Sequence, residues 1–426
     1  MNGRSYPDGS MWMRRPPRQP KKMLRPLRSV DFLPSPVPDR PGLLIRDPFR
    51  FSDAVLIVPP ALVSCLQLFD GEHSELDLRA HLVQLTGELD VSGLAAHLTR
   101  TLSDAGFLED EQFERRKLEA ERNFAAAPER LAVHAGSGYP AEEEELRKTF
   151  AQYMNGSSLI SPAENHHESR LAIVAPHVSP FGGVDAYRAA YSALTSADAD
   201  RTFVILGTSH YGQPDRIGLT RKPFVTPLGA AAIETSIVDR LAAEAGEGAL
   251  MEDYCHSIEH SIEFQVVFLQ HLFGPGIRVA PILCGSFARS FLGGNPPEAD
   301  EGVKCALGAL AELAAREGDR LLWVLGVDMA HMGRRYGDSL SAHANQGEME
   351  LVALRDRARI ERMERGDAQG FWELVSENRD DLRWCGSAPI YAFLRAVPQA
   401  RGSLLHYQQW NIDPASVVSF AGMRFR

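Results

Sequence analysis

The sequence predicts an α/β fold with a largely parallel central sheet flanked by helices, preceded by a small winged-helix-like α+β domain. Continuous apolar runs at residues 171–176, 202–207 and 321–327 are typical of strands buried on both faces. From residue 171 onward such strands alternate with helical patterns, which favours a parallel sheet. Residues 31–113 instead show two strand-like runs followed by three helical patterns.

Composition and charge restrict the class of protein. The chain has 426 residues, of which 44% are hydrophobic and 24% charged, as in an ordinary globular protein. Its net charge of −11 argues against nucleic-acid binding by the whole chain. The five cysteines form no CxxC pair, which suggests a reducing compartment. No run is long enough to span a membrane, and no apolar stretch follows the basic N-terminus as in a signal peptide. We therefore expect a cytoplasmic protein that binds no membrane.

Shifts in composition divide the chain into four parts. Residues 1–30 are rich in proline, lysine and arginine and predict a disordered basic tail, which is more typical of a solvated tail than of a nucleic-acid or partner arm. Residues 31–113 form the winged-helix-like domain. Residues 114–129 form a charge-laced linker helix that ends at Pro128. The α/β domain covers residues 130–426.

The elements of the small domain follow from local signals. Strands are predicted at 42–46 and 54–58, and a short helix over 60–69 is closed by Asp70-Gly71. Ser74 is an N-cap, and apolar residues at helical spacing follow it. A third helix is predicted near 91–105 and ends at Gly106.

The elements of the α/β domain alternate. Strands are predicted at 171–176, 202–208, 278–284 and 321–327, and two closing strands at 403–410 and 417–425. Helices are predicted at 141–150, 186–194, 233–245, 261–273, 301–317, 345–366, 370–378 and 389–397. His166 and His167, an adjacent pair in a polar loop, are interpreted as surface residues.

Chemistry-bearing residues follow three of the buried strands. His177 and His210 end the first two, and Asp328 and His331 follow the third. Ligands of parallel α/β sheets bind beyond the carboxyl ends of the strands, so we expect these residues at one rim. Imidazole is the commonest transition-metal ligand, and a cluster of histidines indicates a metal site. Asp328 and His331 would share a face if they lay on a helical turn.

Two further motifs are candidates for the same rim. Cys385 lies just before a predicted helix, where a thiolate would act as nucleophile or metal ligand; the alternative is a buried, inert thiol. The helix start predicts a lowered pKa for this thiol. The segment Glu259-His260-Ser-Ile-Glu263 opens another helix, so both glutamates could line the rim, or could cap or solvate the helix.

Six motifs together resemble the Memo family, whose bacterial members are called AmmeMemoRadiSam system protein B. They are Ala132-Val-His-Ala-Gly-Ser-Gly-Tyr-Pro, Ala175-Pro-His, Leu206-Gly-Thr-Ser-His, Glu259-His-Ser-Ile-Glu, Val327-Asp-Met-Ala-His and Cys385-Gly-Ser-Ala-Pro-Ile. The resemblance covers residues 130–426 and implies a fold similar to class III extradiol dioxygenases, which are non-haem iron enzymes. It implies metal binding by His177, His210 and Cys385, catalytic roles for Asp328 and His331, and a cleft that also contains Glu259 and His260.

The chain departs from these patterns at two points. The dioxygenases bind Fe(II) through two histidines and a glutamate, whereas the third candidate here is Cys385, a soft ligand that favours copper or a redox role. Ala175-Pro-His-Val-Ser-Pro-Phe-Gly-Gly also replaces the more usual Pro-His-Ala-Gly-Tyr of the family, which changes the lip beside His177.

The small domain has a resemblance of its own. Leu68-Phe-Asp-Gly-Glu-His-Ser, Leu76-Asp-Leu and Leu102-Ser-Asp-Ala-Gly-Phe-Leu resemble the peptide-binding domain of PqqD-like proteins. Peptide recognition, a purely structural extension and DNA binding all stay open for this domain.

Two functions follow. The first is a metal-dependent redox protein, dioxygenase-like in activity, with an iron or copper ion. The second is a non-catalytic peptide- or protein-binding module that reuses the dioxygenase fold. The family name implies a radical-SAM protein as partner, which is compatible with either function, and the PqqD-like domain implies a peptide ligand.

Overall fold

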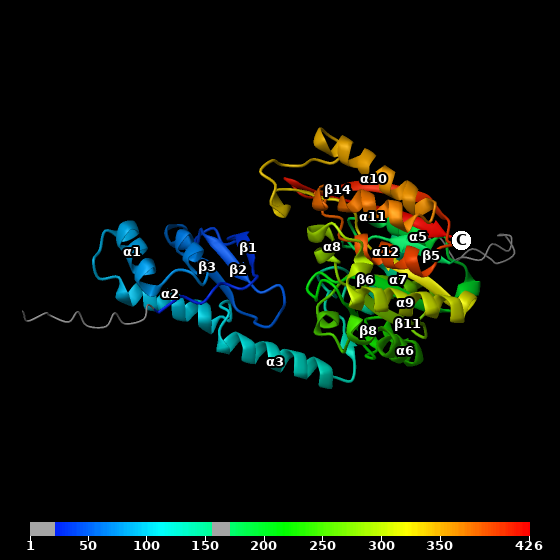
Figure 1. Cartoon of the computed structure of the whole chain (residues 1–426), viewed down its shortest axis with the longest axis horizontal. Coiled ribbons are helices and arrows are strands. Elements are labelled where there is room, and N and C mark those ends of the chain that lie inside the picture. Colours follow the sequence, from blue (N-terminus) through cyan, green and yellow to red (C-terminus); the bar gives the residue numbers. More distant parts are fainter. Residues whose placement is uncertain (1–21, 156–170) are drawn as a thin grey trace, which may run out of the picture. The chain divides into compact units, whose positions relative to one another are not determined.

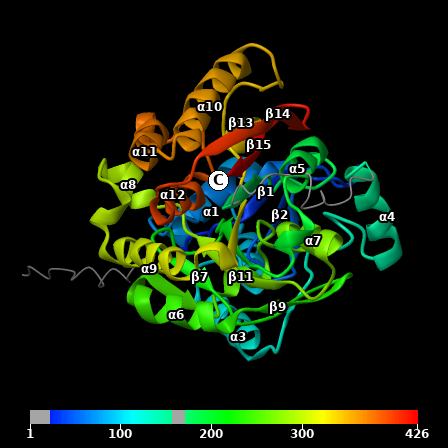
Figure 2. The same ribbon diagram turned by 90° about the vertical axis from the view of Figure 1, so that its right-hand side faces the viewer.

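The computed structural model describes residues 22–155 and 171–426, and the chain divides into two compact units, Met1–Ala120 and Glu121–Arg426 (Figures 1 and 2). Most of the predicted basic tail and the His166-His167 pair lie outside the described residues.

The N-terminal unit combines a small antiparallel sheet with helices. The sheet has the order β1 (Asp31–Pro34), β2 (Leu43–Arg46), β3 (Val55–Val58), and β1 is a strand that the sequence did not predict. A 3-10 helix (Pro60–Leu68), α1 (Glu75–Thr86), α2 (Ser92–Asp104) and the start of α3 (Glu111–Ala126) follow. Ser74 caps α1 in a capping box with Asp77, as the sequence predicts.

The predicted disordered tail does not extend to residue 30. Leu24 is buried, and Met23 and Leu27 form β-bridges to Ser74 and Leu108. The buried Arg28 guanidinium lies 2.5 Å from the carboxylate of Asp47. Apolar burial and a paired charge therefore hold residues 22–30 against the unit.

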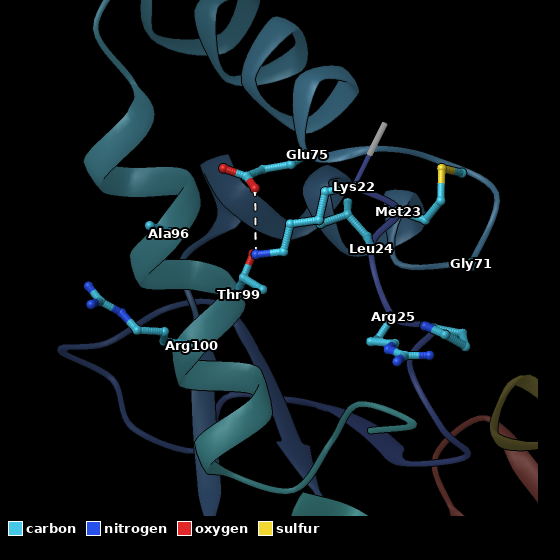
Figure 3. Close-up of a pocket in the computed structure, with 10 residues that line it drawn as sticks. Lys22, Met23, Leu24, Arg25, Gly71, Glu75, Ala96, Thr99 and Arg100 are labelled. Atoms are coloured by element: carbon cyan, nitrogen blue, oxygen red, sulfur yellow. Dashed lines mark ion pairs between the residues drawn. The ribbon is translucent and has the colours of Figure 1, made fainter. Parts of the chain in front are cut away.

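A groove of about 660 Å³ crosses the N-terminal unit (Figure 3). The extended segment 22–26, the start of α1 and one face of α2 line it. Three of its residues are cationic, Lys22, Arg25 and Arg100, while Glu75 lies 3.9 Å from the Lys22 ammonium.

The larger unit is built on a mixed sheet with a parallel centre. Its order is β13-β15-β5-β12-β6-β11-β9-β8-β4. The parallel strands are β5 (Ala172–Ala175), β12 (Leu321–Gly326), β6 (Thr202–Thr208) and β11 (Arg278–Cys284). Gly326 pairs with both Ala175 and Gly207, so these three strands end at the same level.

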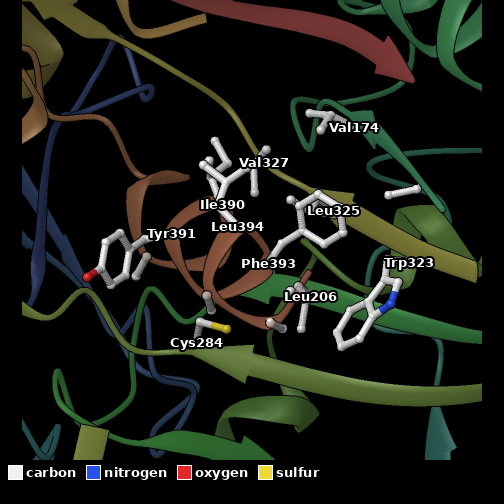
Figure 4. Packing of buried hydrophobic residues seen from close by; sticks show 14 of the residues in the cluster. Val174, Leu206, Cys284, Trp323, Leu325, Val327, Ile390, Tyr391, Phe393 and Leu394 are labelled. Carbon is white, nitrogen blue, oxygen red and sulfur yellow. The ribbon is translucent and has the colours of Figure 1, made fainter. Parts of the chain in front are cut away.

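Helices cover both faces of this sheet. Ile173, Phe203 and Ile205 pack on one face against α4 (Glu143–Tyr153), α5 (Val184–Tyr191) and α7 (Glu263–Phe273). Val174 and Leu206 point to the opposite face, which packs against α12 (Figure 4). The helices of that side are α6 (Thr235–Ala245), α9 (Glu301–Glu317), α10 (Glu348–Glu364), α11 (Ala368–Ser376) and α12 (Ser387–Ala396). The α/β architecture predicted from the sequence is confirmed.

Antiparallel strands close one edge of the sheet. β14 (Gly402–Asp413) and β15 (Ser416–Phe425) form the predicted closing pair, and β15 also pairs with β5 and with β13 (His331–Gly333). Elements that the sequence did not predict are short: β4 (Arg130–Leu131), β7 (Ile217–Leu219), β8 (Phe224–Thr226), β9 (Gly229–Ile233), β10 (Ala249–Met251) and α8 (Ala288–Gly293). Within the described ranges, no helix is both long and apolar enough to cross a membrane.

Candidate functional site

Three histidines meet at the carboxyl ends of the parallel strands. His177 follows β5, His210 follows β6, and their ring centroids lie 5.0 Å apart. His260, from the loop before α7, lies 5.1 Å from His177 and 5.0 Å from His210 by the same measure. One nitrogen of each ring lies within 4.8 Å of the others, so the three imidazoles could bind one metal ion.

The buried carboxylate of Glu259 orients two of these rings. Its Oε1 atom lies 3.0 Å from Nδ1 of His210 and 3.1 Å from Nδ1 of His260. Backbone N–H groups of His210, His260 and Ser261 also donate to this carboxylate. Burial alone would raise the pKa of Glu259, but the two histidines lower it well below its usual value. The carboxylate therefore stays ionised and holds both Nδ1–H groups.

His177 is held in the same tautomer by a different acceptor. Its Nδ1 lies 2.9 Å from the carbonyl oxygen of Gly326, which can only accept a hydrogen bond. Each ring of the triad therefore carries its proton on Nδ1 and presents a lone pair on Nε2. Burial and the neighbouring His210 and His260 lower the pKa of His177 well below its usual value, so this ring is neutral.

His210 is the ring that attracts a proton. Burial opposes its charge, but the charge and hydrogen bond of Glu259 outweigh burial and raise its pKa. His210 is also accessible, with 27% of its side chain exposed.

Asp328 lies beneath the triad. Its Oδ1 accepts the backbone N–H groups of His177 at 2.9 Å and Val178 at 3.3 Å, and Oδ2 lies 3.4 Å from Nε2 of His177. Burial raises the pKa of Asp328 to about 7, although the two backbone donors oppose that shift. At neutral pH this carboxyl group can therefore hold or release a proton beside His177.

His331 lies at the same rim. Its Nδ1 donates to the carbonyl oxygens of Met329 at 2.9 Å and Arg383 at 3.0 Å. Burial and the neighbouring His210 lower its pKa to about 4, so it is neutral. Residues 327–330 have no helical structure and His331 begins β13, so Asp328 and His331 do not share the face of a helical turn.

Cys385 contacts the site but has the opposite acidity to that predicted. Its Sγ lies 3.3 Å from Nε2 of His177 and 3.6 Å from the carbonyl oxygen of Asp328. Burial and the charge of Asp328 raise the pKa of this thiol well above its usual value. The prediction of a low-pKa thiol is wrong because desolvation outweighs the start of α12.

The two glutamates of the 259–263 segment do not line the rim together. Glu263 is buried and forms an ion pair with Arg130, and it accepts a hydrogen bond from the Tyr139 hydroxyl. Its carboxylate also accepts the backbone N–H groups of Val133 and His134. Glu263 is therefore a structural anchor for residues 130–139, while Glu259 serves the cleft.

Comparison with known proteins places this arrangement in a family. The fold and the site define an α/β protein with a cluster of three histidines at the strand ends. The family model described as Memo-like protein matches residues 130–424. The chain therefore belongs to the Memo-like protein family, as the six motifs predict.

Similar proteins come from bacteria and archaea. A MEMO1 family protein from Aquifex aeolicus is 26% identical over 389 residues, covering 90% of this chain and 95% of the relative. A MEMO1 family protein from Thermococcus kodakarensis is 30% identical, covering 70% of this chain and 99% of the relative. One from Thermus thermophilus is 28% identical, covering 73% and 86%.

The Glu259→Gln substitution tests the role of the carboxylate. Gln keeps the size of the side chain but removes the charge that raises the pKa of His210, so we expect that pKa to fall. NMR titration of the histidine ring protons in the metal-free protein measures it. Glu252→Gln, which alters a carboxylate paired with Thr220 and Lys222, is the matched control. An unchanged His210 pKa in Glu259→Gln would contradict the role assigned to this carboxylate.

Alkylation tests the acidity of Cys385. Because the thiolate is the reactive form and burial keeps this thiol protonated, iodoacetamide at pH 7 should label Cys305 before Cys385. Peptide mapping gives the order of labelling. Asp328→Asn removes a charge that raises the pKa of Cys385, so this variant should label faster at Cys385. Labelling of Cys385 ahead of Cys305 in the unaltered protein would restore the low-pKa prediction.

Proposed function

We propose that the cleft binds one redox-active transition metal ion, iron or copper, and that the protein is a metal-dependent redox protein. The observation that carries the proposal is the convergence of His177, His210 and His260, whose nitrogens lie within 4.8 Å of one another. Each Nδ1 is occupied by an oxygen acceptor, which leaves Nε2 as the donor atom. Neutral imidazoles suit iron and copper alike.

The donor set differs from the one expected from the sequence. His260 takes the third position that the family resemblance assigned to Cys385, because its ring belongs to the triad. Cys385 lies beside His177 and would be a fourth ligand once it loses its proton. A thiolate in the set favours Cu(I), whereas three imidazoles without it also suit Fe(II).

Asp328 and His331 would take part in proton transfer and hydrogen bonding around the metal. The metal would supply one-electron redox chemistry. Asp328 would hold or release a proton at Oδ2, 3.4 Å from Nε2 of His177, because burial brings its pKa to about 7. His331 is neutral with its Nδ1–H donated to the backbone, so its Nε2 would accept a hydrogen bond from a protonated group nearby.

The metal site is tested by elemental analysis after anaerobic purification. The unaltered protein should contain about one iron or copper per chain, and the double variant His177→Ala, His210→Ala should contain almost none. His260→Ala should lose most of the metal because it removes a triad ligand, whereas Cys385→Ser should retain it with a shifted iron-to-copper preference. His343→Ala, at an exposed histidine, is the control. Equal metal contents in the double variant and the control would refute the site.

A second function, peptide or protein binding without catalysis, is favoured by the groove of the N-terminal unit. Acidic residues outnumber lysine and arginine in residues 22–120, yet the groove contains Lys22, Arg25 and Arg100. Apolar atoms of Met23 and Pro26 lie beside these cations. Charge complementarity therefore favours an acidic, partly apolar peptide. A radical-SAM protein, the partner implied by the family name, is one source of such a segment.

A fluorescent peptide of alternating glutamate and leucine tests this groove. We expect it to bind the full chain, and the double variant Arg25→Glu, Arg100→Glu to weaken binding at least tenfold, because two attractive charges become repulsive. Fluorescence anisotropy at low salt measures the affinity. Arg40→Glu, an exposed residue outside the groove, has the same chemistry and should change little. Similar losses in both variants would indicate nonspecific attraction and overturn this second function.

A further inference from the structure

The hydroxyl of Tyr336 is an unused hydrogen-bonding group beside the cleft. Tyr336 ends a 3-10 turn (Arg334–Tyr336) after β13, and its ring lies edge-on to that of His331 with centroids 4.9 Å apart. The side chain is partly buried. Among the residues that the structure describes, none is a hydrogen-bond partner of this hydroxyl. The phenol is therefore free to donate to a bound molecule.

The surroundings of Tyr336 keep its phenol protonated. Burial raises the pKa of Tyr336, Arg335 opposes this shift, and the charges of Asp328, Cys385 and Asp413 add to it. The phenol therefore keeps its proton at neutral pH, and its ring contact with His331 places it next to the histidine site. A protonated phenol is a donor, so the complementary group on a ligand is a hydrogen-bond acceptor.

Apolar side chains next to Tyr336 form a surface, here called the wall, that consists of Val178, Phe181, Trp410 and Val418. In the antiparallel register, His331 pairs with Val418 and Val418 pairs with Trp410, so these side chains share one face of the sheet. Tyr336 and Trp410 both pack on a cluster that contains Val178 and Val418.

The wall ends in an accessible aromatic residue. Phe181 lies four residues after His177, is 60% exposed, and meets the Trp410 ring edge-on at 5.6 Å between centroids. Large apolar side chains left exposed beside a candidate site are typical of ligand-binding surfaces. Phe181 belongs to the motif in which this sequence departs from the family pattern.

We propose that Tyr336 is a ligand-binding residue of the cleft, and that its hydroxyl donates a hydrogen bond to an uncharged carbonyl or hydroxyl oxygen of a small molecule whose apolar body lies against the wall. An uncharged oxygen fits because Tyr336 packs on the apolar side chains of Val178 and Val418, where a charged group would lose its hydration. This inference rests on the proposed function only in taking the histidine cleft as the site where the ligand binds.

The test compares two probes that differ in one acceptor. Acetophenone carries a carbonyl oxygen, and ethylbenzene has a similar apolar body without it. Ligand-observed NMR on the metal-free full chain gives both affinities. The unaltered protein should bind acetophenone more tightly than ethylbenzene, and Tyr336→Phe, which keeps the ring against His331, should weaken acetophenone binding about two- to tenfold with no change for ethylbenzene. Tyr336→Leu, which removes the ring, should weaken both probes.

The controls separate this role from a structural one. Tyr153→Phe removes a hydroxyl from α4, which packs in a different hydrophobic cluster from that of Tyr336, and should leave both affinities unchanged. A general loss of structure would weaken both probes in Tyr336→Phe, whereas the proposal requires loss for acetophenone alone. Equal binding of the two probes by the unaltered protein, or unchanged acetophenone binding in Tyr336→Phe, would overturn it. Since these measurements use metal-free protein, a failure of the metal site appears separately in the elemental analysis.

Discussion

The cleft depends on one buried carboxylate. Glu259 accepts hydrogen bonds from the His210 imidazole and from three backbone N–H groups, and lies 3.1 Å from Nδ1 of His260, in place of the water it loses on burial. Hydrogen bonds to a charged acceptor are stronger than neutral ones and carry a geometric preference. They set the tautomer and the direction of His210 and His260 together. The third ring, His177, receives the same tautomer from the backbone oxygen of Gly326 at the end of β12.

A second buried charge holds the segment that carries Glu259. Arg130 pairs with Glu263 and also donates to the carbonyl oxygens of His256 and Glu259. The guanidinium therefore joins the start of the larger unit to both ends of residues 256–263. The match to the Memo-like family begins at this residue, 130. Removing one partner of such a pair would leave an uncompensated buried charge, which is far more costly than the pair itself.

Hydrophobic periodicity and the positions of the strand ends were enough to predict the central strands and part of the site. Long apolar runs located β5, β6, β11 and β12, and the rule for parallel sheets brought His177, His210 and Asp328 to one rim. His260 was predicted to line the site but not to bind the metal, because it lies in a loop and does not follow a predicted strand. The acidity of Cys385 was mispredicted, because burial depends on neighbours distant in sequence. The short strands β7, β8 and β10 have three residues each, too few for an alternating pattern to be recognised.

The proposed metal ion fits the charges around the triad better than protons do. One carboxylate, Glu259, is ionised beside the rings and raises the pKa of His210, whereas at His177 burial and the neighbouring histidines outweigh it. The pKa values of His177 and His331 are lowered, so both of these rings are neutral at neutral pH. A cluster of converging neutral imidazoles places several lone pairs in one region, where they repel one another. A single cation bound at that point would engage all three donors at once, which protonation of His210 alone cannot do.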